Sequence, residues 1–582
     1  MNNFKKRKSM PKALLFLSLV MFLAACGHTP GSDSNTPASS GSPDTPSNSV
    51  GSVVTSTSES PDTPSNNTGS VVSSSVGTSN ESSNTGSNSS VGGDEQKFED
   101  IDQTVPAIDI GEQNFKTREF VTFPTFTTDR SEAMKPNTFL YSENLSYELS
   151  EDGTHYIVKG FDPWKEHGND VYIKPYIGDI PVTEIASESF GYKWYIFNVY
   201  IPHTITFIGA GAFNACGLKN LYYDGNVDDF LSSNWVFYPQ LSDNTAPSNI
   251  VQNIEIVVGP NVTRIPGRFM LPLGTHTTYV PTVKSLRFTV DSKVTSIGEY
   301  AFYNSATLNE LYLPDSLKTI ENHAFYNTGI KEVYLPDNLV SIGEQAFMMD
   351  DDIKMVRFPT SLKSIGYEAF YANKSVEYID LSETKIETLD DAVFKECSNL
   401  KYVTLPNGLK EINDSAFEND ISLEFIDILD CVESLGLKAF ANCKSLKYIR
   451  LGENLKKIGN ECFKNSVNLS RLIINSKEIQ DLPSNNKVFI NSGKESGNLE
   501  VLFTSSVNKI AKRMFFSSAL LDESILIKRL DLSSGLTKID DYAIYNCRVD
   551  TLVFNGSEQE YHVIDISSLN ELPSEVNLRG GK

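Results

Sequence analysis

The chain has few of the residues from which enzymes build reactive centres. Its 582 residues include seven histidines, seven cysteines and three tryptophans. The histidines are scattered, and the sequence contains no H-E-x-x-H motif, nucleophile elbow or phosphate-binding glycine loop. We therefore expect no enzymatic activity, no cofactor and no metal site. A catalytic unit outside the repeats would have to lie in the short segment 96–170, which shows no catalytic constellation.

Basic residues are also scarce, and the formal net charge is −24 at pH 7. Nucleic acid is bound by basic patches, so we expect no nucleic-acid partner. The acidity suits basic or neutral partners or divalent cations, but the solvation of an exported protein explains it equally well. The run Asp350-Asp351-Asp352 lacks the further oxygen ligands that calcium requires, which favours a solvated loop.

Aromatic residues, lysine and arginine are absent between Gly27 and Glu95. Serine, threonine, proline, asparagine and glycine dominate this stretch, and SPDTPSN occurs at 42–48 and again at 60–66. Such a composition cannot bury enough apolar surface to offset the entropy of ordering the chain. Residues 26–95 are therefore predicted to form a disordered stalk.

The N-terminus combines a basic region with a short apolar run. Lysine and arginine occupy positions 5–8, and the apolar run Ala13–Ala25 is too short to span a bilayer. It ends in Leu23-Ala24-Ala25-Cys26-Gly27, which resembles a bacterial lipobox. The resemblance implies that residues 1–25 are a lipoprotein signal peptide, that Cys26 carries lipid, and that only this lipid contacts the membrane. An ordinary secretory signal with a chance cysteine is the alternative.

Residues 96–180 are predicted to form a small β-rich cap that contains a hairpin. Leu145–Leu149 alternates between apolar and polar residues, Asp152-Gly153 follows, and Tyr156–Val158 is a second apolar run. Asp-Gly between two such runs predicts a type I′ turn, in which both central residues have positive φ. A solenoid needs such a cap over its open hydrophobic end.

The rest of the chain repeats one pattern around a phenylalanine. From Phe302 to Phe463 successive copies are 22–24 residues apart, which indicates a solenoid. We place it at residues 181–565, with about 14 repeats, and a C-terminal tail at 566–582. The aligned positions are Phe190, Phe213, Phe269, Phe302, Phe325, Phe347, Phe370, Phe394, Phe417, Phe440, Phe463, Phe489, Phe515 and Ile544.

Each repeat contains a short strand followed by an Ala-Phe segment. In Leu400–Pro406, Val403 and Leu405 alternate with polar residues, as on one face of a strand, and the proline ends it. The Ala-Phe segment suits one short helical turn with a buried Phe. Glycines such as Gly343 and Gly366 are expected to adopt left-handed turns. One repeat buries too little apolar surface to fold alone, which explains why the pattern recurs.

The motif L-x-x-V-x-L-P-x-x-L-x-x-I-G-x-x-A-F resembles the BspA-like leucine-rich repeats of bacterial surface proteins. It stands here as Leu308–Phe325 and Leu400–Phe417, and the resemblance covers about residues 170–565. It implies a curved right-handed solenoid, mostly β with short helical turns, built on a parallel sheet. It also implies surface proteins that bind host matrix proteins, mucosal surfaces or other bacteria, and a repeat without a defined active site.

Six cysteines besides Cys26 would allow disulfides in an exported protein. Cys216, Cys397, Cys443 and Cys547 nevertheless share one repeat position, three residues after the aligned Phe or Ile. Cys397 and Cys443 would be about 9–10 Å apart, two repeats away from each other, which exceeds disulfide reach. We therefore predict buried free thiols.

The outward-facing strand positions supply a candidate ligand face. Tyr378, Tyr402, Phe425 and Tyr448 would stack as an exposed aromatic ridge. The predicted ion pairs beside it are Arg357–Asp380 and Asp427–Arg450. These ladders either stabilise the sheet or form a binding hot spot, and both interpretations stay open. The residues assigned to this face are Tyr378, Tyr402, Phe425, Tyr448, Tyr312, Tyr334, Arg357 and Arg450.

Two functions therefore fit the sequence. The first is a lipid-anchored, extracytoplasmic protein, exposed at the bacterial cell surface, that binds a protein or glycan ligand on host or bacterial surfaces. The second is a scaffold of the cell envelope without a host ligand. Neither the repeats nor the stalk identifies a ligand.

Overall fold

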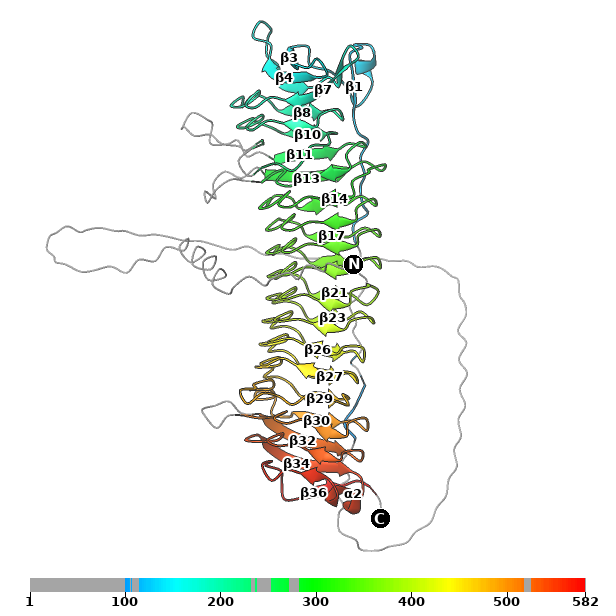
Figure 1. Cartoon of the computed structure of the whole chain (residues 1–582), viewed down its shortest axis with the longest axis vertical. Helices are drawn as coiled ribbons and strands as arrows, with labels where there is room; N and C mark the ends of the chain where they lie inside the picture. The colour runs from blue at the N-terminus through cyan, green and yellow to red at the C-terminus, as the bar shows by residue number, and fades with distance from the viewer. Residues whose placement is uncertain are drawn as a thin grey trace, which may run out of the picture. The chain divides into compact units, whose positions relative to one another are not determined.

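Each repeat forms one turn of a solenoid, here called a rung. The computed structural model describes residues 100–104, 106, 115–231, 236–237, 253–271, 282–517 and 525–580. The predicted signal peptide, Cys26 and the predicted stalk lie outside these residues. The described residues belong to one unit, Gln96–Lys582. Its rungs follow one another in chain order, from cyan to red in Figure 1, which confirms the predicted solenoid.

The longer strands of successive rungs run in parallel and pair within four sheets, which together make up the long-strand layer. Their register aligns equivalent residues, so that Ile379 lies opposite Val403 and Ile426 opposite Ile449. These central side chains are buried, because the strand alternation turns their neighbours outward. The strands are β5 (Asp170–Tyr172), β8 (Asn198–Ile201), β10 (Asn220–Tyr223), β11 (Asn253–Val258), β13 (Thr282–Phe288), β15 (Glu310–Leu311), β17 (Glu332–Tyr334), β19 (Met355–Arg357), β21 (Tyr378–Asp380), β23 (Tyr402–Thr404), β25 (Phe425–Ile428), β27 (Tyr448–Leu451), β29 (Arg471–Ile474), β30 (Glu500–Phe503), β32 (Leu526–Ser533), β34 (Arg548–Asn555) and β36 (Val576–Leu578).

A second parallel layer, the short-strand layer, contains two-residue strands. Each ends in an apolar side chain that is buried in most rungs, and Ile342 lies opposite Ile365 in the register. The strands are β9 (Phe207–Ile208), β12 (Arg264–Ile265), β14 (Ser296–Ile297), β16 (Thr319–Ile320), β18 (Ser341–Ile342), β20 (Ser364–Ile365), β22 (Thr388–Leu389), β24 (Glu411–Ile412), β26 (Ser434–Leu435), β28 (Lys457–Ile458), β31 (Lys509–Ile510), β33 (Lys538–Ile539) and β35 (Asp565–Ile566).

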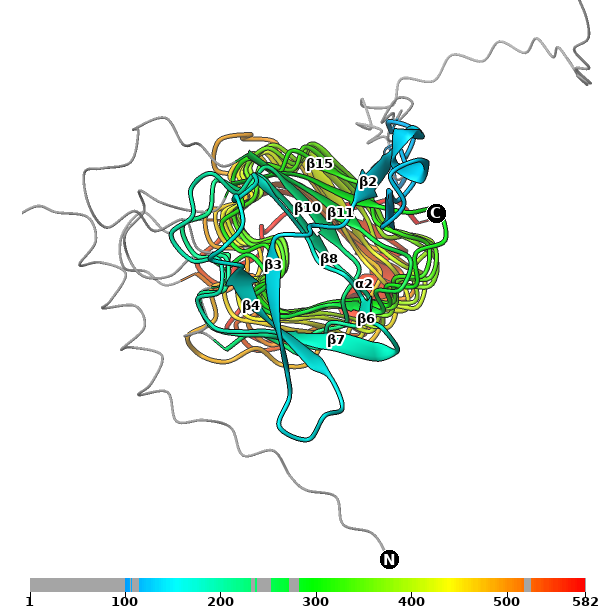
Figure 2. The same cartoon turned by 90° about the horizontal axis from the view of Figure 1, so that it is seen from above.

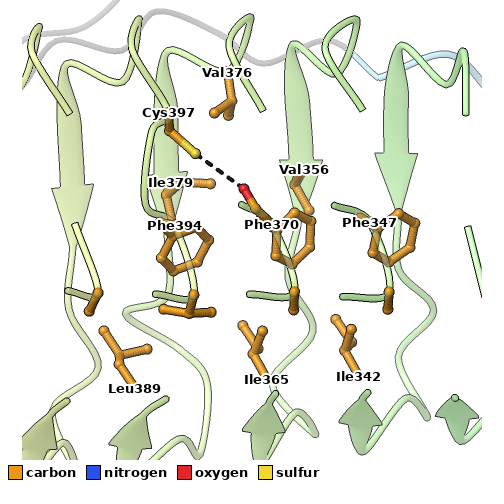
Figure 3. Packing of buried hydrophobic residues seen from close by; sticks show 14 of the residues in the cluster. Ile342, Phe347, Val356, Ile365, Phe370, Val376, Ile379, Leu389, Phe394 and Cys397 are labelled. Carbon is orange, nitrogen blue, oxygen red and sulfur yellow. Dashed lines mark hydrogen bonds between the residues drawn. The ribbon is translucent and has the colours of Figure 1, made fainter. Parts of the chain in front are cut away.

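The repeated phenylalanines stack as one column inside the solenoid. Phe347, Phe370 and Phe394 lie side by side in successive rungs, between the two layers, as Figure 3 shows. From Phe302 to Phe489 neighbouring ring centroids are 5.1–5.7 Å apart. The column is a continuous apolar core that no single rung could bury, since each ring is covered by the rings above and below it.

The column differs from the sequence alignment at two places. Phe237 stacks on Phe213 with a centroid distance of 5.6 Å and adds a rung that the alignment missed. Met270, and not Phe269, occupies the next position, because its amide donates to the carbonyl oxygen of Ala301 just as the amide of Phe302 donates to Ala324. The predicted continuation at Ile544 is confirmed by the bond from the Phe515 amide to Ala543.

The Ala-Phe segments are tight turns rather than hydrogen-bonded helix. Ala301 and Ser305 each donate to the carbonyl oxygen three residues earlier, and the residues two before and two after Phe302, Tyr300 and Asn304, have φ near 60°. The prediction that glycines such as Gly343 and Gly366 adopt left-handed turns is wrong, because neither has a positive φ. A Cβ on Gly343 would lie 2.6 Å from the Asn322 amide nitrogen of the preceding rung, so glycine is required there by close approach.

A hairpin covers the N-terminal end of the stack. β3 (Leu145–Leu149) pairs antiparallel with β4 (Tyr156–Phe161), and β4 pairs in parallel with β7 (Ile180–Ile185), so the hairpin lies across the first rung (Figure 2). β6 (Tyr176–Ile177) pairs with β7. The hairpin is confirmed, but the type I′ turn is wrong. Gly153, with φ 70°, is the one residue of the 150–155 loop in the left-handed region, since the connection is longer than two residues.

The repeat extends beyond both predicted boundaries, 181 and 565. β5 pairs with β8 at the start, and β36 pairs with β34 at the end, so residues assigned to the cap and the tail belong to the long-strand layer. The short helix α2 (Glu558–His562) lies between β34 and β36 in the chain, and Ser557 and Glu560 form its capping box. Among the described residues, no helix has the length and apolar character needed to cross a bilayer.

Candidate functional site: the outer face of the long-strand layer

Two columns of side chains cover the outer face of the long-strand layer, and their membership agrees with the sequence analysis. The register aligns Tyr378 with Tyr402 and Phe425 with Tyr448 in the first column. In the second column Tyr312 lies beside Tyr334, and Tyr334 opposite Arg357. The parallel in-register pairing therefore brings equivalent residues of different repeats into contact.

The aromatic ridge forms, but two of its members are not exposed. The ring centroids of Tyr402 and Phe425 are 5.7 Å apart, and those of Phe425 and Tyr448 are 6.4 Å apart. Tyr378 and Tyr402 are half-buried, whereas Phe425 and Tyr448 are only 6% and 3% exposed. The predicted exposure is therefore wrong for Phe425 and Tyr448, because another part of the chain covers them.

The cover is an N-terminal strap, defined here as the described residues 100–104, 106 and 115–127. At its beginning, Ile101 is 4% exposed and packs in one apolar cluster with side chains of the outer face. The carboxylate of Asp102 lies 3.3 Å from the guanidinium of Arg471. The cluster around Ile101 consists of Phe425, Tyr448, Ile473 and Leu502, with Tyr402 against its edge.

Further along the strap, Phe115 and Arg118 contact the rungs of β15 and β17. The rings of Phe115 and Tyr334 meet edge to face with centroids 5.9 Å apart. The guanidinium of Arg118 lies 4.7 Å from the Tyr334 centroid and 2.6 Å from the carboxylate of Asp315. Tyr312 is buried beneath this part of the strap.

The strap ends in a small sheet that covers the first rungs. β1 (Thr125–Thr127) pairs in parallel with β2 (Thr138–Leu140), and the 3-10 turn η1 (Glu132–Met134) lies between them. In Figure 2 this sheet lies outside β10 and β11. The Phe126 ring stacks on Tyr200 at 3.7 Å, and burial there raises the pKa of Tyr200. The strap thus contacts the outer face near both ends and in the middle of the stack.

One of the two predicted ion pairs of the outer face is confirmed. The Arg450 guanidinium lies 2.9 Å from Asp427 and 2.7 Å from Asp430. The Arg357–Asp380 pair is wrong. Arg357 turns toward the preceding rung instead, where it contacts Asp337 at 2.5 Å, the Leu335 carbonyl and the Tyr334 ring. Three favourable contacts on that side outweigh a single exposed pair.

The predicted solvated loop at 350–352 is wrong for its first residue. Asp350 is fully buried and accepts a hydrogen bond from the Thr328 hydroxyl at 2.9 Å. Burial raises the pKa of Asp350 well above its usual value, although the Thr328 hydrogen bonds oppose this effect. Asp351 pairs with Lys374 at 3.0 Å. Within the described residues, no group of three acidic, histidine or cysteine side chains could hold a metal ion.

The six later cysteines are free thiols, as predicted, and five of them are buried. The thiol of Cys397 donates to the Phe370 carbonyl oxygen at 3.3 Å, one rung earlier (Figure 3). Cys443 makes the same contact with Phe417 at 3.3 Å. Burial raises the pKa of the Cys216 thiol to about 12, so this sulfur is not a nucleophile at neutral pH.

A second aromatic cluster, on the turn side of the rungs, was missed by sequence reasoning. Tyr300 stacks on His323 at 4.3 Å, and Tyr303 stacks on Tyr326 at 4.5 Å. His323 is half-buried, and burial lowers its pKa. The signal was present in the consecutive repeats as YAFY and HAFY at 300–303 and 323–326.

A family model described as a BspA type leucine-rich repeat region matches the chain in six copies, over residues 176–256, 279–385, 365–494, 412–547 and 488–569. These matches cover more than half of the chain. The chain therefore belongs to the BspA-type leucine-rich repeat family, and the predicted fold class is confirmed. No curated protein matches the chain.

Several solved structures are similar in fold. A leucine-rich repeat protein from Bacteroides ovatus is 20% identical, with 75% of this chain and 98% of that chain covered and a TM-score of 0.41. A leucine-rich cell surface protein from Faecalibacterium prausnitzii is 18% identical, with 73% and 97% covered and a TM-score of 0.31. The pneumococcal vaccine antigen PcpA is 15% identical, with 76% and 98% covered and a TM-score of 0.30.

Proposed function

We propose that the protein is a lipid-anchored bacterial surface protein that binds another protein or a glycan through the outer face of the long-strand layer. It would adhere to host matrix or mucosal proteins or to other cells. The observation that carries the proposal is the repeated row of aromatic and arginine side chains on the parallel strands of the outer face. Aromatic and arginine side chains contribute most of the binding energy in protein interfaces.

Half-buried members of the outer face offer the sharpest test of binding. The mature chain would be applied to an array of matrix proteins, mucins and bacterial surfaces. Tyr378→Ser combined with Tyr402→Ser should weaken any saturable binding while the melting temperature changes little, because both rings are half-buried. Tyr367→Ser, an exposed position on the turn side, is the matched control. Unchanged binding by the double variant would show that the ligand does not bind at Tyr378 and Tyr402.

Lipid attachment at Cys26 is tested separately. Cells that express the protein would be fed labelled fatty acid, and label should enter the wild-type chain but not Cys26→Ser. Equal label in both chains would show that the lipid is attached elsewhere than at Cys26. No label in either chain would show that the N-terminal motif is an ordinary secretory signal, and surface attachment would then need another explanation.

The alternative function is a scaffold of the cell envelope without a host ligand. The strap favours it, because Phe425, Tyr448 and Tyr312 are already buried by intramolecular contacts. A scaffold would bind nothing on the array, and deletion of its gene would cause envelope defects. Saturable binding to a single class of ligand would reject this alternative.

A further inference from the structure

We propose that the start of the strap, Asp100-Ile101-Asp102, is a resident ligand of the outer face, and that the outside partner is an extended peptide in which an apolar residue is flanked by acidic ones. Such a peptide replaces the strap at the same site. The inference rests on the proposed function, because it assumes that the outer face binds a protein, and it names the chemistry of that protein.

The site is built from four consecutive rungs. Ile101 is buried among Phe425 of β25, Tyr448 of β27, Ile473 of β29 and Leu502 of β30. Two of these side chains belong to the first outward column and two to the second. These four side chains are here called the seat. Because rungs repeat at the spacing of strands in a sheet, the seat accepts one apolar side chain of an extended peptide that runs along the stack.

Basic side chains flank the seat and select acidic neighbours. Asp102 pairs with Arg471 at 3.3 Å, and Asp100 pairs with Arg579. Hydrogen bonds from Thr104, together with the positive charge of Arg471, lower the pKa of Asp102. The two carboxylates stand on either side of Ile101 in the sequence. The recognised pattern is therefore acidic, apolar, acidic.

The strap leaves two buried hydrogen-bonding groups of this site without partners among the described residues. Tyr448 is 3% exposed, yet its hydroxyl has no hydrogen-bond partner among the described residues. The buried Nε of Arg471 also lacks an acceptor within that part of the chain. A buried donor without an acceptor lowers the stability of the complex that contains it. A peptide that adds a carbonyl or carboxylate oxygen here gains bonds that the strap does not make.

The strap can occupy the site through few contacts because it is part of the same chain. A tethered segment has an effective concentration in the millimolar range, so a single apolar anchor and two exposed ion pairs suffice. The same contacts in a separate peptide would be weak. A partner must therefore add the missing hydrogen bonds or further anchors, and the strap excludes segments that lack them.

The test uses the full mature chain and a fluorescent peptide with the sequence of residues 96–106. A release variant carries Asp100→Asn, Ile101→Ser and Asp102→Asn. The peptide should bind the release variant at least about tenfold more tightly than the wild type, since the tethered competitor is lost. Adding Arg471→Ala to the release variant should abolish binding, whereas Lys363→Ala on the short-strand layer should not. Circular dichroism melting of each variant checks that it is folded.

Two results would overturn the inference: equal peptide affinity for wild type and release variant, or binding that survives Arg471→Ala. If the release variant fails to fold, Asp102→Asn alone serves, and peptide binding no tighter than that of the wild type counts against the inference. The array separates this inference from the proposed function. An array ligand that binds wild type and release variant equally supports the function and rejects the strap as a competitor. If the peptide binds the release variant but neither chain binds any ligand on the array, the peptide-binding site is supported and the surface-binding function is rejected.

Discussion

The carboxyl group of Asp350 accepts a hydrogen bond from the Thr328 hydroxyl, 2.9 Å away on the preceding rung. Both side chains are buried and belong to a column three residues after the phenylalanine column. A side chain at this position reaches back one rung, as the thiol of Cys397 does to the Phe370 carbonyl. Small polar residues therefore connect rungs inside the core. The column contains Ser305, Thr328, Asp350, Asn373, Cys397, Asp420, Cys443, Ser466 and Ser492.

The pH dependence of stability should reveal the least satisfied member of this column, Asp420. It is fully buried, and neither carboxyl oxygen has a hydrogen-bond partner among the described residues. Burial raises its pKa well above the usual value, and the nearby Cys397 amide offsets only part of this shift. The folded state therefore binds the proton more tightly than the unfolded state. The contribution of Asp420 to stability should be greatest below a pH of about 4, the unfolded carboxyl pKa, and should fall as pH rises toward its folded pKa.

Asp420→Asn removes this titration and should raise the free energy of unfolding at pH 7 by about 1–3 kcal/mol. It should also flatten the dependence of stability on pH between 4 and 7. Denaturant unfolding at the two pH values measures both effects. Asp351→Asn is the control, because Asp351 is exposed, and its change should stay within about 0.5 kcal/mol. A variant less stable than wild type at pH 7 would mean that the carboxylate has a favourable partner.

The phenylalanine column predicts a large and local effect of truncation. Phe370 is buried between Phe347 and Phe394, with centroid distances of 5.2 and 5.7 Å. Phe370→Ala should cost about 3–5 kcal/mol, because the rigid rungs cannot close the cavity. Hydrogen exchange should increase mainly at residues 341–400, since rungs contact only their neighbours. Tyr367→Ala, an exposed neighbour, should change little, and unchanged exchange around Phe370 would contradict its role in the core.

The column was predictable from the sequence, whereas the strap was not. A phenylalanine every 22–24 residues, with alternating apolar strand residues, determines the solenoid, the two outward columns and the shared position of the cysteines. Each of these depends only on the repeat period. Ile101 and Asp102 contact residues more than 300 positions away, and a single apolar residue between acids carries no periodic signal. The exposure of Phe425 and Tyr448 was mispredicted for this reason.

Thiol reactivity should follow burial. Cys431 is partly exposed, while Cys216, Cys397, Cys443, Cys462 and Cys547 are buried. A disulfide reagent should label Cys431 first in the folded protein, and the buried thiols only after unfolding, because thiolate formation needs water. Cys431→Ser should abolish the fast phase and leave the slow one. Fast labelling of two or more thiols in the Cys431→Ser variant would contradict the packing of the core.

An asparagine ladder on the turn side should stabilise the stack. Asn442 donates to the Asn419 side-chain oxygen at 2.8 Å and accepts from Asn465 at 2.7 Å. Its φ of 65° lies in the left-handed region, which asparagine tolerates better than alanine. Asn442→Ala loses both hydrogen bonds and strains the backbone, so it should cost about 1–3 kcal/mol.

Asn442→Gly separates the two contributions. Glycine adopts the same φ without strain but makes no ladder, so its stability should lie between those of the wild type and the alanine variant. Asn407→Ala, in an exposed loop, is the matched control and should change stability by less than about 0.5 kcal/mol. Denaturant unfolding of the four proteins gives the ranking. Equal stability of the alanine variant and the wild type would show that the ladder follows from the turn geometry and contributes no stability of its own.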